Sequence, residues 1–267
     1  MSEPHCRLTR SRFVRGAALA ACVAAVVPVR AAPDAQAILA ASDEVRNPAK
    51  PFGVAVTLIE YRSGKQTDTN TLFVLSKADT HRGQYHSLIR FVAPPRDANK
   101  LMLKSGNELW FFDPASKASI RISPQQRLLG QAANGDVLTV NLAKDYRAEW
   151  LGEEELIDGE RVARRAHKLG LVATSPDVTY HRIELWVDTG SSRPIKARFF
   201  AESGRLLKTA YYRKFAPQLG RERPTEVVII DGLDPQWVTV MRYSDFVWRD
   251  VPDAWLQRDY LPRFKPE

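Results

Sequence analysis

Cysteine is scarce in this 267-residue sequence, and both cysteines, Cys6 and Cys22, lie near the N-terminus. No disulfide can therefore form within residues 32–267, so this part of the chain has to be stabilised by its hydrophobic core. Long apolar runs are scarce as well. The main one, residues 16–27, is about a dozen residues long, whereas a membrane-spanning helix needs roughly 20. A transmembrane helix is therefore not expected.

Residues 1–31 have the three-part pattern of a secretory signal. Four arginines between positions 7 and 15 precede the apolar run, and positions 29 and 31 hold the small or β-branched residues that a signal peptidase reads. We therefore predict export to the periplasm and a mature domain over residues 32–267. An alternative stays open, because Leu19-Ala20-Ala21-Cys22 matches a lipobox and lipidation of Cys22 would anchor the exported chain.

The charge of the mature chain is mildly positive. The whole sequence has a net charge of +8, and residues 1–31 contribute half of it through five arginines against one glutamate. The remaining excess is spread along the chain without a basic block. Nucleic acid is therefore not expected as a partner.

Motifs for catalysis and metal binding are missing from the sequence. It has no H-E-x-x-H, paired C-x-x-C, phosphate-binding loop, G-x-G-x-x-G or G-x-S-x-G pattern. Glu153–Glu155 is the densest acidic cluster, but consecutive carboxylates are typical of a solvated edge and not of an opposed catalytic pair. His181 begins an apolar strand face and is expected to be a partly buried structural residue. We predict no catalytic residue, no metal site and no cofactor.

Apolar and polar residues alternate along much of the mature chain, as at residues 180–188, which is typical of antiparallel strands with two different faces. Turns such as Ser63-Gly64 and Ser203-Gly204 separate the runs. There is no βαβ rhythm, so we predict a mainly β fold with one large antiparallel sheet, curled or closed. The predicted strands are 53–61, 69–77, 85–92, 100–104, 108–113, 118–122, 147–152, 162–169, 179–187, 194–201, 206–215, 225–231 and 237–247.

Three segments depart from the strand pattern. Residues 33–48 are predicted to be helical, and residues 252–261 to form a short C-terminal helix. Between them, Ser123 and Pro124 provide the cap and first position of a helix, so residues 123–143 are predicted to form two short helices. Their apolar side chains have to be buried, either as a plug in the core or as a lid over a cavity. The sequence leaves these two interpretations open.

The sequence also resembles a known family, the outer-membrane lipoprotein-sorting proteins of the periplasm, and in particular a LolA-like branch. Residues 106–114, GNELWFFDP, resemble the strand–turn segment of that family, and residues 88–95 resemble its strand that ends in proline. The order of the similar segments extends over residues 38–264. Further matching segments are 121–124, 128–130, 145–146, 151–154, 180–188, 203–208 and 260–263.

This resemblance implies an incomplete β-barrel whose short helices form a lid over an apolar cavity. It also implies a carrier that takes the acyl chains of lipoproteins or lipids across the periplasm. As partners we predict these acyl chains and an inner-membrane transporter, and we expect the chain to be a monomer. Sorting carriers hold the lid with an arginine on an early strand, whereas this chain has Ser76-Lys77 near that place. The predicted lid residues are Leu128, Leu129, Val137, Val140 and Leu142, and the predicted sheet residues are Phe91, Trp110 and Phe112.

Two other functions remain as alternatives. The chain could be an accessory envelope protein that partners a membrane transporter without using a cavity. It could also be a hydrolase of envelope lipid or glycan, which would need a convergent pair of catalytic groups, with His181 and a nearby acid as the first candidates.

Overall fold

The structure is a computed structural model that describes residues 32–265. The predicted export signal and Cys22 lie outside the described residues. No helix in the described range is both long and apolar enough to cross a bilayer.

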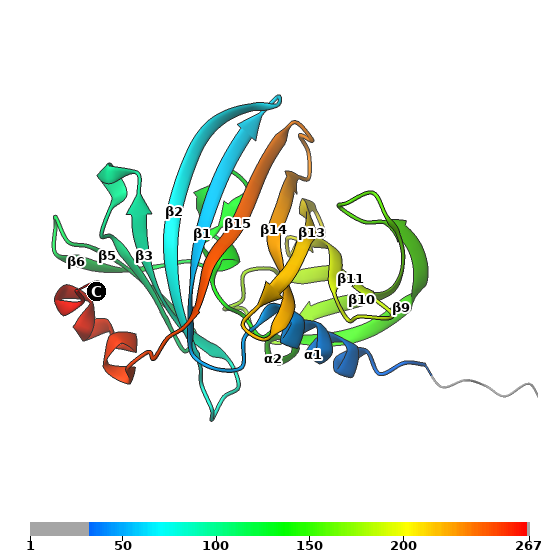
Figure 1. The fold of residues 1–267 in the computed structure, drawn as a ribbon, viewed down its shortest axis with the longest axis horizontal. Coiled ribbons are helices and arrows are strands. Elements are labelled where there is room, and N and C mark those ends of the chain that lie inside the picture. The colour runs from blue at the N-terminus through cyan, green and yellow to red at the C-terminus, as the bar shows by residue number, and fades with distance from the viewer. Residues whose placement is uncertain (1–31, 266–267) are drawn as a thin grey trace, which may run out of the picture. The chain divides into compact units, whose positions relative to one another are not determined.

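One antiparallel sheet of thirteen strands dominates the fold, in the order β6-β5-β4-β3-β2-β1-β15-β14-β13-β12-β11-β10-β9. It is curled but not closed, because no further strand of the described part pairs with β6 or β9 (Figure 1). All thirteen predicted strands are confirmed. Their bounds are β1 Phe52–Arg62, β2 Lys65–Ala78, β3 Tyr85–Ala93, β4 Leu101–Ser105, β5 Glu108–Asp113, β6 Ala118–Ile122, β9 Tyr146–Ile157, β10 Ala163–Ala173, β11 Arg182–Asp188, β12 Pro194–Phe200, β13 Leu206–Gln218, β14 Arg221–Asp231 and β15 Trp237–Trp248.

The predicted N-terminal helix is α1 (Ala35–Arg46). Its first turn is capped by the Asp34 carboxylate, which accepts hydrogen bonds from the backbone N–H groups of Gln36 and Ala37. In Figure 1, α1 lies beside the short helix α2 (Leu142–Asp145) at one end of the strands. The face of the sheet that packs against α1 and α2 is called the inner face below.

The prediction of two short helices within residues 123–143 is wrong for most of that segment. The segment forms a small hairpin of β7 (Arg127–Leu129) and β8 (Ala132–Ala133), the 3-10 turn η2 (Asn134–Val137) and then α2. The Ser123 hydroxyl accepts a hydrogen bond from the Gln125 N–H, as a cap does. However, the next carbonyl, of Pro124, accepts from the Gly135 N–H at 2.9 Å, so the backbone is used by the hairpin and not by a helix.

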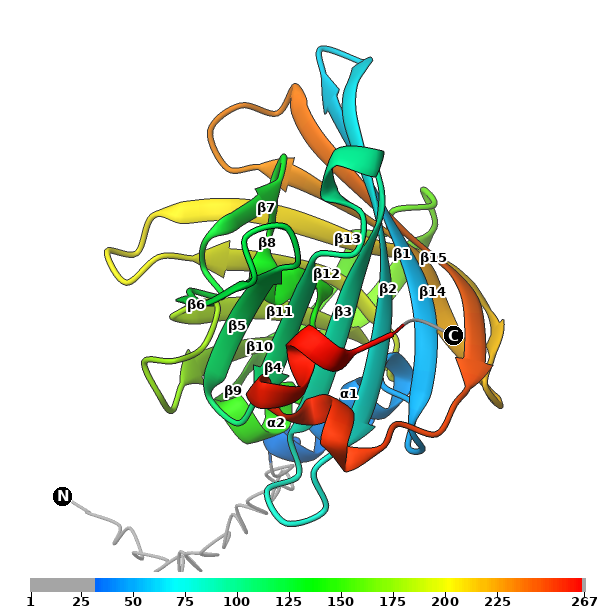
Figure 2. The same ribbon diagram turned by 90° about the vertical axis from the view of Figure 1, so that its left-hand side faces the viewer.

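The C-terminal segment also differs from its prediction. It forms two 3-10 segments, η3 (Asp253–Leu256) and η4 (Arg258–Arg263), instead of one helix. Figure 2 shows this segment in front of β3, β4 and β5, with α1 behind the sheet. The face under η3 and η4 is the outer face, opposite to α1. His181 also departs from its prediction, because it is exposed at the start of β11.

The hydrophobic core is divided between the two faces. The main cluster lies on the inner face and joins strands from β1 to β15 with Leu39 of α1 and with Leu129 and Val137 of the segment between β6 and β9. A second cluster lies on the outer face, where Leu256 and Leu261 cover the β2–β5 strands. Strands β2–β5 are therefore covered on both faces, by the main cluster on the inner face and by the second cluster on the outer face. This explains why these strands have apolar residues on both sides.

A buried carboxylate holds three cations together on the outer face of β13, β14 and β15. The side chain of Glu226 is only 4% exposed and contacts Arg213 at 2.9 Å, Lys214 at 2.9 Å and Arg242 at 3.1 Å. Burial opposes its charged form, but the hydrogen bonds from Lys214 and Arg242 and the charge of Arg213 outweigh it and lower the pKa of Glu226.

Glu226→Gln is expected to lower the free energy of unfolding at neutral pH by about 1.5–3 kcal/mol, because hydrogen bonds to a charged group are lost. The lowered pKa means that the stability from Glu226 is present above its unfolded-state value of 4.5 and is lost as the pH falls through the folded-state value. Urea unfolding at several pH values should therefore show the difference between wild type and variant shrinking in acid. Glu44→Gln is the control, since the Glu44 side chain is 68% exposed; a pH-independent difference for Glu226→Gln would contradict the expectation.

Candidate ligand pocket

A pocket lies between the inner face of the sheet and the segment that precedes β9. Its volume is about 200 Å³. For comparison, an engineered cavity of ~150 Å³ lined by aliphatic and aromatic residues stays dry and binds benzene. The pocket therefore has room for a ring or a short piece of alkyl chain.

Most of the wall is apolar and comes from strands that are far apart in the sequence. The strands contribute inward-facing residues, which alternate with outward-facing ones along each strand. Because β1 and β15 are neighbours in the sheet, residues from both ends of the chain meet here. The apolar strand residues that line the pocket are Phe52, Val54, Val56, Val74, Ile183, Phe199, Ala210, Val227, Ile229, Met241 and Phe246.

Residues 137–142 close the pocket on the side opposite to the strands and are called the lid segment below. Val137, Leu138, Val140 and Leu142 line the pocket, and three of them are among the predicted lid residues. Leu128 and Leu129 belong to the main core cluster next to the pocket and do not line it. The structure thus brings Val137, Val140 and Leu142 together at the pocket.

The predicted sheet residues lie elsewhere. Phe91 is buried in the main cluster, where its ring packs edge-to-face on Phe111 at 6.0 Å, outside the pocket lining. Trp110 and Phe112 lie on the outer face, in the cluster under the C-terminal segment. The guanidinium of Arg258 covers the Trp110 ring at 4.1 Å. The alternation of side chains along β5 correctly places Phe111 on the opposite face from Trp110 and Phe112. It does not tell which of the two faces is the inner one.

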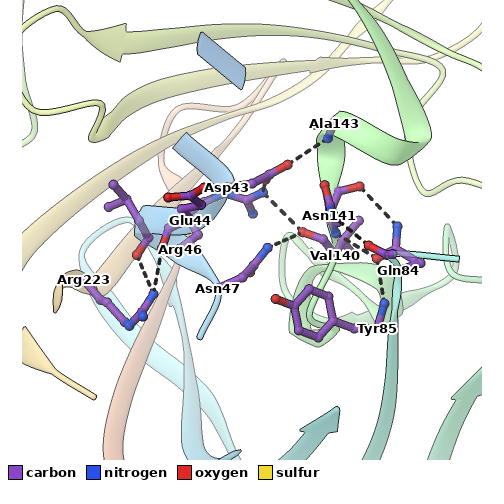
Figure 3. Close-up of polar contacts among 12 residues, drawn as sticks. Asp43, Glu44, Arg46, Asn47, Gln84, Tyr85, Val140, Asn141, Ala143 and Arg223 are labelled. Carbon is purple, nitrogen blue, oxygen red and sulfur yellow. Dashed lines mark hydrogen bonds and ion pairs between the residues drawn. The ribbon is translucent and has the colours of Figure 1, made fainter. Parts of the chain in front are cut away.

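Hydrogen bonds hold the lid segment to the C-terminal end of α1 (Figure 3). The Asn47 side-chain amide donates to the Val140 carbonyl at 2.9 Å, and Arg46 donates to the same carbonyl at 3.3 Å. The Asp43 carboxylate, which also pairs with Arg46, accepts from the Ala143 N–H at 2.7 Å. This set of contacts fixes the position of the lid segment relative to the helix.

The lid segment also makes hydrogen bonds with the turn between β2 and β3 and with β2 itself. The Gln84 side-chain oxygen accepts from the Asn141 N–H at 2.8 Å, and the Asn141 amide donates to the Gly83 carbonyl at 2.9 Å (Figure 3). The Ser76 and Thr139 hydroxyls are 2.7 Å apart. Ser76 lies near the place where sorting carriers have the arginine that holds the lid. In this chain the Ser76 hydroxyl makes the contact with the lid segment instead.

Sequence reasoning missed the lid contacts made by α1. Arg46 and Asn47 look like the cationic last turn and the stop of a helix before Pro48, which is a sufficient local explanation for both. One signal of a second role was the acidic pair Asp43 and Glu44 close to the C-terminal end of the helix, where negative charge is unfavourable to the helix dipole. Burial raises the pKa of Asp43 even though Arg46 acts in the opposite direction.

A buried ion pair lies at the start of the lid segment. Lys208 of β13 pairs with Asp136, and their side chains are 4% and 11% exposed. Asp136 also accepts from the Tyr180 hydroxyl at 2.7 Å, and Lys208 also donates to the Gln131 carbonyl at 3.0 Å. Burial lowers the pKa of Lys208, against the charge of Asp136, which raises it.

The pocket lining contains three carboxylates, Asp136, Asp145 and Asp177, but no histidine. His181 lies outside its lining, and no group of three or more His, Cys, Asp or Glu within residues 32–265 is arranged to hold a metal ion. The arrangement is that of a binding site, with an apolar wall of strands and a lid segment held by polar contacts.

Comparisons with known proteins agree with this architecture. A LolA superfamily protein from Nitrosomonas europaea is 36% identical, with a TM-score of 0.76 over 86% of this chain and 100% of that chain. A domain assigned as an outer membrane lipoprotein-sorting protein, from Vibrio parahaemolyticus, is 18% identical, with a TM-score of 0.72 over 86% of this chain and 98% of that one. A DUF1329 family protein from Desulfovibrio piger is 20% identical, with a TM-score of 0.72 over 85% and 97% of the two chains.

An open, curled antiparallel sheet in the form of an incomplete barrel is the LolA-like fold, and the two more distant structures share it. A family model described as an uncharacterised protein matches residues 83–263. No curated protein matches the chain. The identity and coverage of the Nitrosomonas europaea structure show that this chain belongs to the LolA superfamily.

Proposed function

We propose that the chain is a periplasmic carrier that binds acyl chains of lipoproteins or lipids and moves them toward the outer membrane. The observation that carries the proposal is an apolar pocket formed by strands from both ends of the chain and closed by a lid segment that polar contacts hold. The proposal includes export by residues 1–31, and the resemblance to lipoprotein-sorting proteins supports it.

The energetics of the pocket suit a carrier. Burying one CH₂ group is worth about 0.8 kcal/mol, so an acylated molecule needs a shielded route through water. The pocket has about 200 Å³, which is close to the size of a cavity that holds benzene. A full acyl chain needs more room, and we infer that the lid segment moves to provide it. Closure of the empty lid then competes with the ligand, which keeps binding reversible.

The contacts of the lid segment suit such movement. Each neutral hydrogen bond contributes a net of about 0.5–1.5 kcal/mol in water. The lid contacts from Asn47, Gln84 and Ser76 are few and are made by side chains, so the lid can open without unfolding of the sheet.

The direct test is native mass spectrometry of the protein purified from the periplasm, followed by transfer of a radiolabelled acyl lipid between two vesicle populations. We expect co-purified lipid that leaves on organic extraction, and transfer that increases with protein concentration. Protein without lipid that also fails to accelerate transfer would exclude the carrier function. Capture of a membrane transporter by such a lipid-free protein would instead favour the accessory role.

Asn47→Ala is expected to increase the rate of ligand release about threefold to tenfold, because one hydrogen bond to the Val140 carbonyl is lost and about 0.5–1.5 kcal/mol of lid closure goes with it. Stopped-flow release of a fluorescent fatty acid measures this rate. Gln236→Ala is the matched control: its side chain also makes one hydrogen bond, with Ser63 at 2.8 Å, but on the β1–β2 turn. Equal release rates in the two variants would argue against a lid held by α1.

A further inference from the structure

Two tyrosine hydroxyls on the inner face lack hydrogen-bond partners. Tyr212 of β13 and Tyr243 of β15 both line the pocket, and neither hydroxyl makes a hydrogen bond within residues 32–265. Other tyrosines around the pocket are satisfied: Tyr146 donates to the Tyr180 carbonyl at 2.8 Å, and Tyr180 donates to Asp136 at 2.7 Å. The two hydroxyls without partners are therefore an exception in a wall whose other phenols are paired.

Tyr212 and Tyr243 lie close to one another on the sheet. Tyr212 is opposite Val227 on β14, Val227 is opposite Met241 on β15, and Tyr243 is the next residue of β15 on the same face. Neighbouring strands are about 4.8 Å apart, so the two side chains rise from one small area of the wall. Between them the wall is apolar.

The guanidinium of Arg46 lies near both phenols. It lines the same pocket, and its Nε is buried without a hydrogen-bond partner in the described part of the chain. Burial raises the pKa of Tyr212, against the charge of Arg46, and burial likewise raises the pKa of Tyr243. Both phenols thus keep their protons at neutral pH and are available as donors.

The charged residues that line the pocket are four cations, Arg46, Lys104, Lys208 and Arg223, and three carboxylates, Asp136, Asp145 and Asp177. Arg46 and Lys208 are each paired with a carboxylate. Arg223, at the edge of the pocket, donates only to the backbone carbonyls of Gln218, Glu44 and Val45, and no carboxylate of residues 32–265 pairs with it. The lining therefore has a small excess of positive charge, which suits an oxygen-bearing head better than a cationic one.

We propose that the pocket recognises the oxygen end of an acyl chain, with the hydroxyls of Tyr212 and Tyr243 donating hydrogen bonds to it beside Arg46. Both tyrosines line the pocket and are only half-buried, so their hydroxyls are open to a ligand. A ligand that displaces water from the pocket has to supply an acceptor to these donors, because a polar group that is buried without a partner is unfavourable. The oxygen acceptor is either the carboxylate of a free fatty acid or the carbonyl of an acyl ester. This inference rests on the proposed carrier function and specifies which end of the cargo the pocket reads.

The experiment compares three ligands of one chain length: laurate, methyl laurate and dodecane. Each displaces the neutral fluorescent probe N-phenyl-1-naphthylamine from the delipidated, full-length mature protein. The variant is Tyr212→Phe/Tyr243→Phe, which keeps both rings and removes both hydroxyls. Tyr211→Phe is the matched control, because Tyr211 neighbours Tyr212 on β13 but lies outside the pocket, where Lys196 covers its ring. Thermal unfolding checks that all variants are folded.

We expect wild type and Tyr211→Phe to bind laurate or methyl laurate at least tenfold more tightly than dodecane, and the double variant to lose that preference. A preference for laurate alone identifies a carboxylate, and an equal preference for laurate and methyl laurate identifies an acyl carbonyl. Equal affinity of wild type for all three ligands, or an unchanged preference in the double variant, overturns the inference and leaves the carrier function intact. Wild type that takes up neither probe nor ligand overturns the carrier function itself.

Discussion

Val227→Phe is expected to weaken binding of acyl ligands more than 100-fold, or about 2.7 kcal/mol, while the protein stays as stable as wild type. Val227 lies in the middle of the pocket wall, on β14, with its side chain on the inner face. Phenylalanine replaces the isopropyl group of Val227 with a larger benzyl group, which would project into the roughly 200 Å³ available and take space that the ligand needs. Titration of a fluorescent fatty acid measures the affinity, and urea unfolding measures the stability.

The matched control is Val228→Phe, which makes the same change at the next residue of β14. Val228 is on the outer face of β14 and does not line the pocket, so Val228→Phe is expected to leave ligand affinity unchanged. Filling a void commonly stabilises a protein by about 0.5–2 kcal/mol, whereas overpacking a filled core costs about 1–3 kcal/mol. A strong loss of stability in Val227→Phe would therefore show that the lid segment plugs a filled core and covers no usable cavity.

Lys208→Met is expected to lower the free energy of unfolding by about 3–5 kcal/mol, because it leaves Asp136 as a buried charge without its cation. The pair joins β13 to the start of the lid segment, and both side chains are almost fully buried. Urea unfolding monitored by tryptophan fluorescence gives the change from the shift in midpoint at constant slope.

Two further variants test the cause of that loss. Lys77→Met removes the cation from a surface pair with Asp253, whose side chain is 81% exposed, and should cost less than about 1 kcal/mol. Adding Asp136→Asn to Lys208→Met should restore part of the stability, since the buried charge is removed as well. A cost below about 1 kcal/mol for Lys208→Met alone would mean that water reaches Asp136 in the folded protein.

The strands could be predicted from the sequence because their signal is local. Residues 180–188 alternate between two kinds of face, and glycines mark turns such as Ser63-Gly64, where both residues have positive φ angles. The helix at residues 35–46 carries its own cap at Asp34 and is followed by Pro48. In each case the residues that determine the element lie within it or directly beside it.

The sequence predicted where the lid segment lies but not its secondary structure, because the hydrogen-bond partners of its backbone are far away in the sequence. The cap of Ser123 and the following proline suit a helix, yet the Pro124 carbonyl bonds to Gly135 and the Val140 carbonyl bonds to Asn47. The Pro124 carbonyl thus accepts from a residue beyond the hairpin in place of the i+4 N–H that a helix would supply. Tertiary contacts therefore replaced the predicted helices with turns.

By itself, the sequence determined that residues 32–267 form one large antiparallel sheet with no cysteine to crosslink it, and that residues 123–143 interrupt it. Only the tertiary structure decided which face of each strand looks inward, because a period of two separates Phe111 from Trp110 and Phe112 without saying which side encloses the pocket. It also decided which polar residues share the site, since Arg46, Tyr212 and Tyr243 come from three elements that the curl of the sheet brings together.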